Sequence, residues 1–558
     1  MLGIKLRTWL SLLLIALYGG ACLWASSTAP DGAAAVAHGG HHGIDGMDLE
    51  LFWGIPFAGV LLSIALMPLF MEHFWHHHYG KVALFWALLF AIPFYLNFHE
   101  AATYEFAHIM LLDYVPFIIL LSTLFAAAGG ICLKGTLRGS PAVNTGILAL
   151  GTVLASFMGT TGAAMLLIRP MIKANKWRKK QAHLMVFFIF LVANIGGSLT
   201  PLGDPPLFLG FLKGVSFFWT LHMAPLMLVS SAILLVIFFL LDTVLYKKEG
   251  TPPDDGVREP LHLEGKVNFL ILGGIIGAIL LSSLLSKSSA FFDQAKFDAK
   301  ATEVTEASKL QTEASDTLST FVKAHEKDLK AVTEELKTLR VAQQDATNKA
   351  NSLRSGQEGE AVKGVKVMGV TVPFTNVLRD GLLIILLVLS IILTKASTRA
   401  DNFFSWAPIM EVAKLFSAIF LTIIPVLKIL QAGVHGQLAD VIWAVLKPNN
   451  SANDVMYFWF TGALSSFLDN APTYVVFFNT AGGDAASLMK GMTTLLAISA
   501  GAVFMGANTY IGNAPNFMVK SIAEENHIKM PSFFGYMAWS IGILIPVFIL
   551  LTFLFFVH

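Results

Sequence analysis

Two short stretches of this 558-residue sequence place Asp, Asn and Thr among Gly and Pro within strongly apolar surroundings. Residues 197–208 read Gly-Ser-Leu-Thr-Pro-Leu-Gly-Asp-Pro-Pro-Leu-Phe, and residues 506–517 read Gly-Ala-Asn-Thr-Tyr-Ile-Gly-Asn-Ala-Pro-Asn-Phe. The two stretches align without a gap, and Gly, Thr, Gly, Pro and Phe recur in place. Upstream, residues 156–160 align on residues 466–470 at nearly the same distance from the second motif. Two motif pairs at one spacing predict an internal repeat.

The polar residues of these motifs offer hydroxyl, amide and carboxylate oxygens, which are the ligands that a small hard cation prefers. Pro and Gly also free backbone carbonyl groups where they interrupt a helix. Single Thr and Asn residues could instead cap the interrupted helices. The candidate cation ligands are Thr160, Thr161, Thr200 and Asp204 in the first half, and Asp469, Asn470, Thr473, Asn508, Thr509 and Asn513 in the second.

Asp204 and Asp469 are the two carboxylates of the motifs. Ionisable groups inside a membrane are costly and usually functional. A carboxylate there can hold a proton or a cation, so Na⁺ and H⁺ can compete for Asp469, with Asp204 as the carboxylate of the first half. Either Asp could instead cap the N-terminus of a half-helix.

The elements that must position these residues are membrane helices. The chain is 55% hydrophobic and 13% charged, against roughly 25% charged in soluble proteins, and many apolar stretches reach the about 20 residues that span a bilayer. The net charge of +1 gives no basic surface for nucleic acid. We expect ordinary spans near 51–71, 82–98, 109–131, 222–246, 266–287, 375–394, 406–430 and 534–557.

Four further segments are expected to be irregular. Polar, Pro and Gly residues interrupt 182–215 and 491–520, which predicts broken helices, while 142–169 and 442–479 are expected to enter and leave by one face as re-entrant hairpins. The basic loop 173–180 is expected on the cytoplasmic side.

The predicted fold class is therefore an all-α polytopic membrane protein with two inverted five-span halves. The first repeat covers 51–246, and the second covers 266–287 and 372–558. Each has a re-entrant hairpin and a broken helix, and the site is expected near the midplane where the breaks meet.

Residues 288–371 are charged and are expected on the outer, periplasmic side. No Gly or Pro occurs from Gln294 to Arg354, which would allow a single helix of roughly 90 Å. A heptad seam predicts either a solvated helix that packs on itself or a coiled coil that joins two protomers. The seam residues are Leu318, Val322, His325, Leu329, Val332, Leu336 and Leu339.

The N-terminal residues 1–27 are typical of a signal peptide, with an uncleaved first span as the alternative. Residues 28–50 are expected to form a flexible outer linker. His99, Glu100, Glu105 and His108 are expected to be solvated loop residues at an outer mouth, and Asp113 to lie near a span end or to pair within the bundle.

On these motifs the chain resembles the ion transporter superfamily, which includes NhaD-type sodium/proton antiporters, citrate and dicarboxylate/sodium symporters and arsenite permeases. The resemblance covers about residues 50–290 and 372–558, through Asp469-Asn470-Ala471-Pro472-Thr473 and Asn508-Thr509. It implies Na⁺ sites at the hairpin tips, a homodimer in the cytoplasmic (inner) membrane, and elevator-type motion. One departure is Gly159-Thr160-Thr161, where NhaD-type antiporters carry an Asp-Asn pair.

Two transport functions remain open. One is Na⁺ (or Li⁺)/H⁺ antiport, and the other is Na⁺-coupled uptake of citrate or a dicarboxylate. An acidic tip without Arg or Lys disfavours a polyanion, although helix N-termini alone can hold a carboxylate. A third class, a non-transporting sensor with 288–370 as its partner domain, is disfavoured by two intact motifs. Nothing in the sequence indicates covalent catalysis or a redox cofactor.

Overall fold

The computed structural model describes residues 44–250 and 259–557, apart from 327 and 330. The predicted signal peptide and most of the predicted linker lie outside the described residues. Within them, seven helices are long and apolar enough to cross a bilayer, or eight if a pair bent by 40° counts as one span. The prediction of an all-α polytopic membrane protein is confirmed.

Most long helices fall within a few residues of the predicted spans, but the helix Glu72–Ile109 extends well beyond both ends of the predicted span 82–98. Residues predicted as spans 82–98 and 109–131 lie on α3 and α4, which a π-helix at Met110–Tyr114 joins. These elements are α2 (Ile55–Phe70), α3 (Glu72–Ile109), α4 (Val115–Gly129), α9 (Ala224–Glu249), α10 (Val267–Leu285), α14 (Phe374–Leu393), α16 (Ala407–Thr422), α17 (Ile424–Gln431) and α24 (Phe533–Phe555).

Two helical hairpins lie inside this frame. Hairpin 1 consists of α5 (Pro141–Met158) and α6 (Thr160–Ala174), whose ends are joined by the Gly139 N–H donating to the Ala174 carbonyl at 2.9 Å. Hairpin 2 consists of α19 (Asp454–Phe467) and α20 (Asn470–Thr480). Hairpin 2 therefore begins later than the predicted residue 442, because residues 442–453 form the end of α18 (Ala439–Ala444) and a turn, and the Asn453 side chain caps α19.

Two helices are broken where the sequence predicts it. The first consists of α7 (Ala182–Leu191) and α8 (Pro205–Leu212), and the second of α22 (Thr493–Met505) and α23 (Ala514–Glu525). Pro starts α8, and Pro515 lies at the second position of α23, where a missing N–H costs nothing. Every residue of α7 from His183 onward is buried, so this part of the first broken helix lies in the core.

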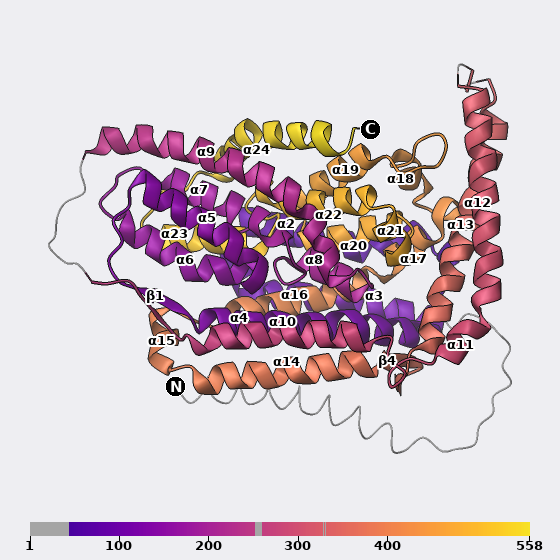
Figure 1. Cartoon of the computed structure of the whole chain (residues 1–558), viewed down its shortest axis with the longest axis horizontal. Helices are drawn as coiled ribbons and strands as arrows, with labels where there is room; N and C mark the ends of the chain where they lie inside the picture. Colours follow the sequence, from indigo (N-terminus) through magenta and orange to yellow (C-terminus); the bar gives the residue numbers. More distant parts are fainter. Residues whose placement is uncertain (1–43, 251–258, 327, 330, 558) are drawn as a thin grey trace.

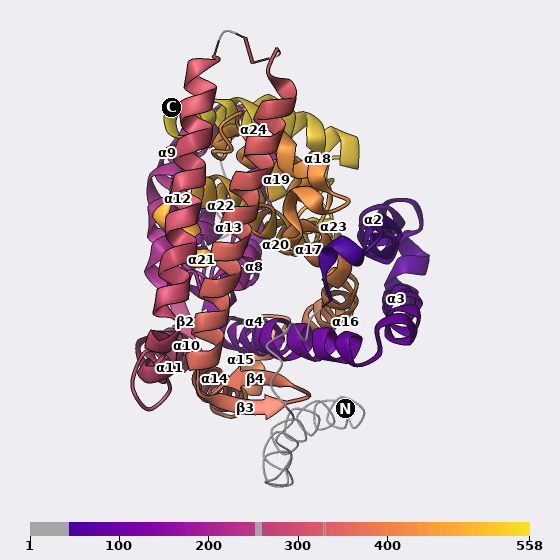
Figure 2. The ribbon, with the colours of Figure 1, turned by 90° about the vertical axis from the view of Figure 1, so that its right-hand side faces the viewer.

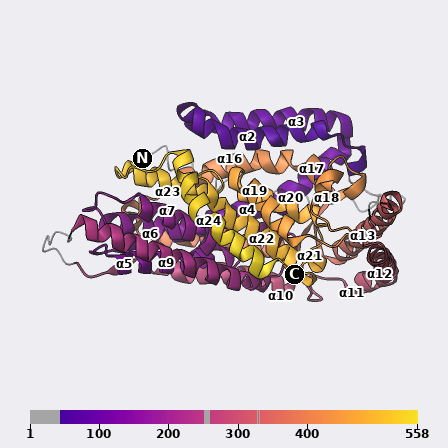
Figure 3. The same cartoon turned by 90° about the horizontal axis from the view of Figure 1, so that it is seen from above.

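Six of the other helices form two groups of three. Helices α4, α10 and α14 contact one another along one edge in Figure 1, and α2 and α3 pack together and against α16 along an edge in Figure 3. Hairpin 1 and hairpin 2 lie toward opposite ends of the molecule in Figure 1. Their tips therefore approach each other from opposite directions.

Short elements join these parts. Strand β1 (Cys132–Lys134) pairs antiparallel with β2 (His262–Glu264), and β3 (Gly364–Val367) with β4 (Val370–Pro373). The Lys134 ammonium lies 2.9 Å from Glu264 and 2.6 Å from Asp401, and it holds together the connections that leave α4 and α9. The other short helices are α15 (Ala396–Asp401) and α21 (Ala485–Lys490).

The inserted segment is a helical pair rather than one long helix. It contains α11 (Gln294–Ala299), α12 (Ala301–Ala324) and α13 (Thr333–Ala361), and Figure 2 shows α12 and α13 side by side. The single continuous helix is thus wrong, because the chain reverses between α12 and α13 and buries Leu318 and Ala350. A single straight helix would leave that seam exposed. A coiled coil between protomers stays a prediction.

The helical pair also lies against the membrane helices. In Figure 1 it runs across their direction, past one end. The Arg340 guanidinium stacks on Trp443 at 4.3 Å and donates to Asn450 at 2.7 Å, and Arg354 donates to Ser487 at 2.8 Å. These contacts fasten α13 over the loops at the open end of hairpin 2.

Candidate functional site

The two breaks are held by the same side-chain contacts. The Thr200 hydroxyl donates to the Ser156 carbonyl, and the Thr509 hydroxyl donates to the Ser466 carbonyl at 2.5 Å. Each Thr hydroxyl also accepts from the backbone N–H two residues later, at 3.1 and 3.2 Å. Each break is thereby fixed to the hairpin of its own half, at positions that the sequence alignment pairs.

Asp204 lies where the two halves meet. It is 1% exposed. Its carboxylate accepts from the Thr160 hydroxyl at 3.3 Å, from the Asn470 amide at 2.6 Å and from the Asn513 amide at 3.2 Å. Thr160 starts hairpin 1's second helix, Asn470 starts that of hairpin 2, and Asn513 precedes α23. One carboxylate therefore joins both hairpin tips and the second break.

Asp469 has a different role in the structure. Its carboxylate caps α20 by accepting from the Ala471 N–H at 3.0 Å, and the side chain is only partly buried. Asp204 makes no such side-chain cap. In this structure Asp469 therefore caps a half-helix, as the sequence analysis allowed, whereas Asp204 is the carboxylate with contacts from both halves.

The other predicted residues hold the local backbone. The Thr473 hydroxyl donates to the Asp469 carbonyl at 3.0 Å within its own helix, and the Asn508 amide donates to the Ser466 hydroxyl at 2.9 Å. Thr161 follows Thr160 in α6 and is partly exposed. Of the ten candidates, the structure thus brings Thr160, Asn470 and Asn513 onto Asp204, while the remaining six shape or border the tips and breaks.

Two buried asparagines at the site escaped the sequence analysis. The Asn194 amide donates to the Asn516 side-chain oxygen at 2.7 Å, and Asn513 donates to the Asn194 side-chain oxygen at 3.2 Å. Asn516 in turn donates to the carbonyls of Gly506 and Thr509. Asn516 falls inside the aligned motif, but it is aligned with Leu207. It is therefore not one of the identical positions that identify the repeat.

The electrostatic setting combines helix N-termini with acidic side chains. Helices α6, α8, α20 and α23 all begin next to residues of the site, and a helix N-terminus carries a partial positive charge. Among the described residues, no Lys, Arg or His pairs with Asp204. The buried side-chain oxygens of Asn470 and Asn508 have no hydrogen-bond partner in the described part of the chain, which suits a hard cation.

Charged groups away from the site are also buried. Glu105 is not in a solvated loop as expected: it lies in α3, is 5% exposed, and pairs with Lys428 at 2.6 Å. Asp113, 3% exposed, pairs within the bundle, with Lys213 at the end of α8 at 2.6 Å. Burial is possible because each carboxylate has a lysine from another helix.

The base of hairpin 1 contains a separate buried network. Asp242 of α9 accepts from Arg178 at 2.6 Å, from His183 at 2.8 Å and from Asn144 at 2.9 Å. Asn175 closes the network by exchanging amide hydrogen bonds with Asn144. This network ties both ends of hairpin 1 to α7 and α9.

A family model described as putative citrate transport matches residues 46–327 and 352–556. The match includes both hairpins, both breaks and most of the inserted segment. No curated protein matches the chain.

Proposed function

Since the chain belongs to the putative citrate transport family, we propose that it is a secondary transporter that exchanges Na⁺ or Li⁺ for H⁺ at a site centred on Asp204. The observation that carries the proposal is that this buried carboxylate has no basic partner among the described residues. Its three side-chain donors are a hydroxyl and two amides. A buried carboxylate without a basic partner is strongly disfavoured, so a proton or a cation must accompany it.

That requirement produces exchange. Occupancy by H⁺ or by Na⁺ neutralises Asp204, whereas the empty site leaves a charge in a medium that disfavours it. The site therefore changes its access from one side of the membrane to the other only when an ion is bound. Binding of one ion excludes the other. The hydroxyl of Thr160 and the unpartnered oxygen of Asn470 would complete the coordination of Na⁺ together with Asp204.

Alternating access follows from the two tips. Hairpin 1 contacts Asp204 through Thr160, and hairpin 2 contacts it through Asn470. Because the hairpins approach from opposite ends (Figure 1), withdrawal of either tip would expose Asp204 to one side only. Binding at the meeting point of broken helices is the general arrangement of inverted-repeat transporters.

Proteoliposomes that contain a pH dye test this proposal. Addition of Na⁺ or Li⁺ outside should release protons from the lumen, and Asp204→Asn should abolish the signal. Asp469→Asn should weaken it, whereas Asp484→Asn should keep it. Asp484 is the matched control, because it caps α21 through the Ser487 N–H at 3.1 Å, at the far end of hairpin 2. Wild-type exchange by Asp204→Asn would refute the proposal.

The second candidate is Na⁺-coupled uptake of citrate or a dicarboxylate. The family description and the four helix N-termini around the site favour it, since such termini can bind a substrate carboxylate. Sodium-dependent accumulation of labelled citrate without a proton signal would establish this function instead. A homodimer in the cytoplasmic membrane belongs to both candidates, and cross-linking in native membranes would detect it.

A further inference from the structure

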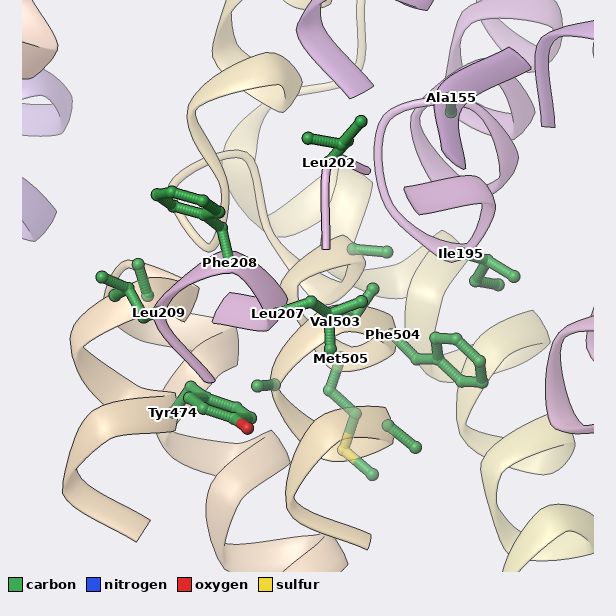
Figure 4. Close-up of a cluster of buried hydrophobic side chains, with 14 of the residues drawn as sticks. Ala155, Ile195, Leu202, Leu207, Phe208, Leu209, Tyr474, Val503, Phe504 and Met505 are labelled. Carbon is green, nitrogen blue, oxygen red and sulfur yellow. The ribbon is translucent and has the colours of Figure 1, made fainter. Parts of the chain in front are cut away.

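The crossing of the two broken helices has one polar side and one apolar side. In the register that pairs Asp204 with Asn513, Asn194 corresponds to Val503 and Asn516 corresponds to Leu207. Asn194 and Asn516 are hydrogen-bonded to each other at 2.7 Å. Their counterparts are apolar: Leu207 and Val503 are both buried in the same hydrophobic cluster, and Figure 4 labels both of them. Matched positions of the two halves therefore carry a hydrogen-bonded pair on one side and apolar residues on the other.

The polar side contains a shared donor. The Asn513 amide has two hydrogens, but three oxygens lie within reach: the Ala193 carbonyl at 3.1 Å, the Asn194 side-chain oxygen at 3.2 Å and the Asp204 carboxylate at 3.2 Å. All these groups are buried, so water cannot replace a missing partner. Asn194 and Asp204 therefore compete for the Asn513 hydrogens.

Asn194 is held in the orientation that this competition requires. Its own amide hydrogens go to the Ile189 carbonyl at 2.8 Å and to Asn516 at 2.7 Å. With both hydrogens engaged on one side, its oxygen faces Asn513. Asn516 is itself fixed by its bonds to two carbonyls of the second break.

We propose that Asn194, held by Asn516, is a positioning residue of the cation site: it accepts the Asn513 hydrogen that Asp204 releases when a cation occupies the carboxylate. The inference rests on the proposed function. It adds the hydrogen bond through which occupancy of Asp204 changes the contact between the two broken helices. With Asp204 empty, Asn513 bonds the carboxylate. With a cation bound, the same hydrogen stabilises the contact between the breaks.

The internal repeat supplies the variant that tests this. Asn194→Val combined with Asn516→Leu copies onto the polar side the residues found at the matched apolar positions, so neither of these two amides is left buried without the other. The carbonyls of Ile189, Gly506 and Thr509 each lose a donor. When a cation occupies Asp204 in this variant, the Ala193 carbonyl is the one acceptor left for Asn513 among those three oxygens. Cation binding is therefore weaker. We expect the Na⁺ concentration at half-maximal exchange to rise about fivefold, the effect of one lost neutral hydrogen bond, with the maximal rate changed less than twofold.

A matched control perturbs the other side of the crossing. Leu207→Met changes only apolar packing, and volume-conserving exchanges of this kind are usually tolerated. This control should keep the wild-type Na⁺ constant. A second readout needs no transport: the Na⁺ concentration that half-maximally raises the melting temperature of the purified protein should shift about fivefold for the polar-side variant alone.

The outcomes separate the two proposals. If the wild-type protein shows neither Na⁺-driven proton release nor stabilisation by Na⁺, the proposed function fails and this inference fails with it. If the wild type responds and the polar-side variant keeps its Na⁺ constant, the inference alone is overturned. A loss of maximal rate at an unchanged constant also rejects it, because that result indicates a structural role. Should the double variant not fold, Asn194→Ala must show the same shift.

Discussion

Gly159 forms the tip of hairpin 1, and its replacement by alanine is expected to damage the site through the backbone alone. Its φ of 80° and ψ of 148° lie in a region that is essentially restricted to glycine. An added Cβ would meet only the Leu202 carbonyl oxygen, at 3.5 Å, which is ordinary contact. Strain rather than collision therefore determines the effect of Gly159→Ala.

The magnitude follows from that conformation. A non-glycine residue in this region costs of order 1–3 kcal/mol, and the smaller backbone entropy of unfolded alanine returns about 0.4–1 kcal/mol. We expect a net loss of about 1–2 kcal/mol. A tip that moves to relieve the strain would also weaken the Thr160 hydroxyl bond to Asp204 and the bond from the Thr160 N–H to the Gly203 carbonyl.

Two measurements check this expectation: the melting temperature in detergent, and Na⁺-driven proton release in proteoliposomes. Gly146→Ala is the control on the same hairpin, because Gly146 lies within α5 and nothing is within 4 Å of its added Cβ. It should leave activity unchanged and stabilise by up to about 1 kcal/mol. Equal stability and activity in the two variants would refute the argument that the positive φ of Gly159 maintains the tip.

Two further predictions concern the buried charges. Asp242→Asn leaves Arg178 buried without its counter-charge, which should cost about 3–5 kcal/mol and lower the melting temperature sharply; an unchanged value would show that hairpin 1 is held by packing alone. Lys213→Met and Asp113→Asn should interact in a double-mutant cycle by about 1–2 kcal/mol, measured by thermal unfolding, and strictly additive losses would show that the pair contributes nothing.

The frame of the molecule could be predicted from the sequence because apolar length and helix-breaking residues act locally. Stretches of about 20 apolar residues must span the bilayer, and most predicted spans agree with the helices within a few residues, with α3 as the exception. Gly196 and Gly197 lie in the break that follows α7, and α8 begins at Pro205. The alignment likewise paired Thr200 with Thr509, which make the same contacts.

What the sequence could not reveal depends on how distant segments cross. Nothing in the motifs ranks Asp204 above Asp469, because the contacts of Asp204 come from residues 44, 266 and 309 positions away. The reversal between α12 and α13 occurs without Gly or Pro, and only the packing of the two helices on each other indicates it. The sequence predicted a solvated Glu105 because its partner, Lys428, lies in the other half of the chain.

The unequal charges of the two halves are a consequence of their pairing in space. Asp204 and Asn513 occupy matched positions and contact each other at 3.2 Å. Two Asp residues there would place two buried carboxylates in contact, and one of them would have to be neutral at all times. Asp opposite Asn leaves one buried charge and supplies a donor that stabilises it.

The tips show the same inequality: Gly159 adopts a positive φ that disfavours Asp, whereas Asp469 has an ordinary φ of −58° and caps its helix. The backbone of the first tip thus disfavours a second carboxylate there, and one buried charge between the two breaks is sufficient for the proposed exchange of H⁺ and Na⁺.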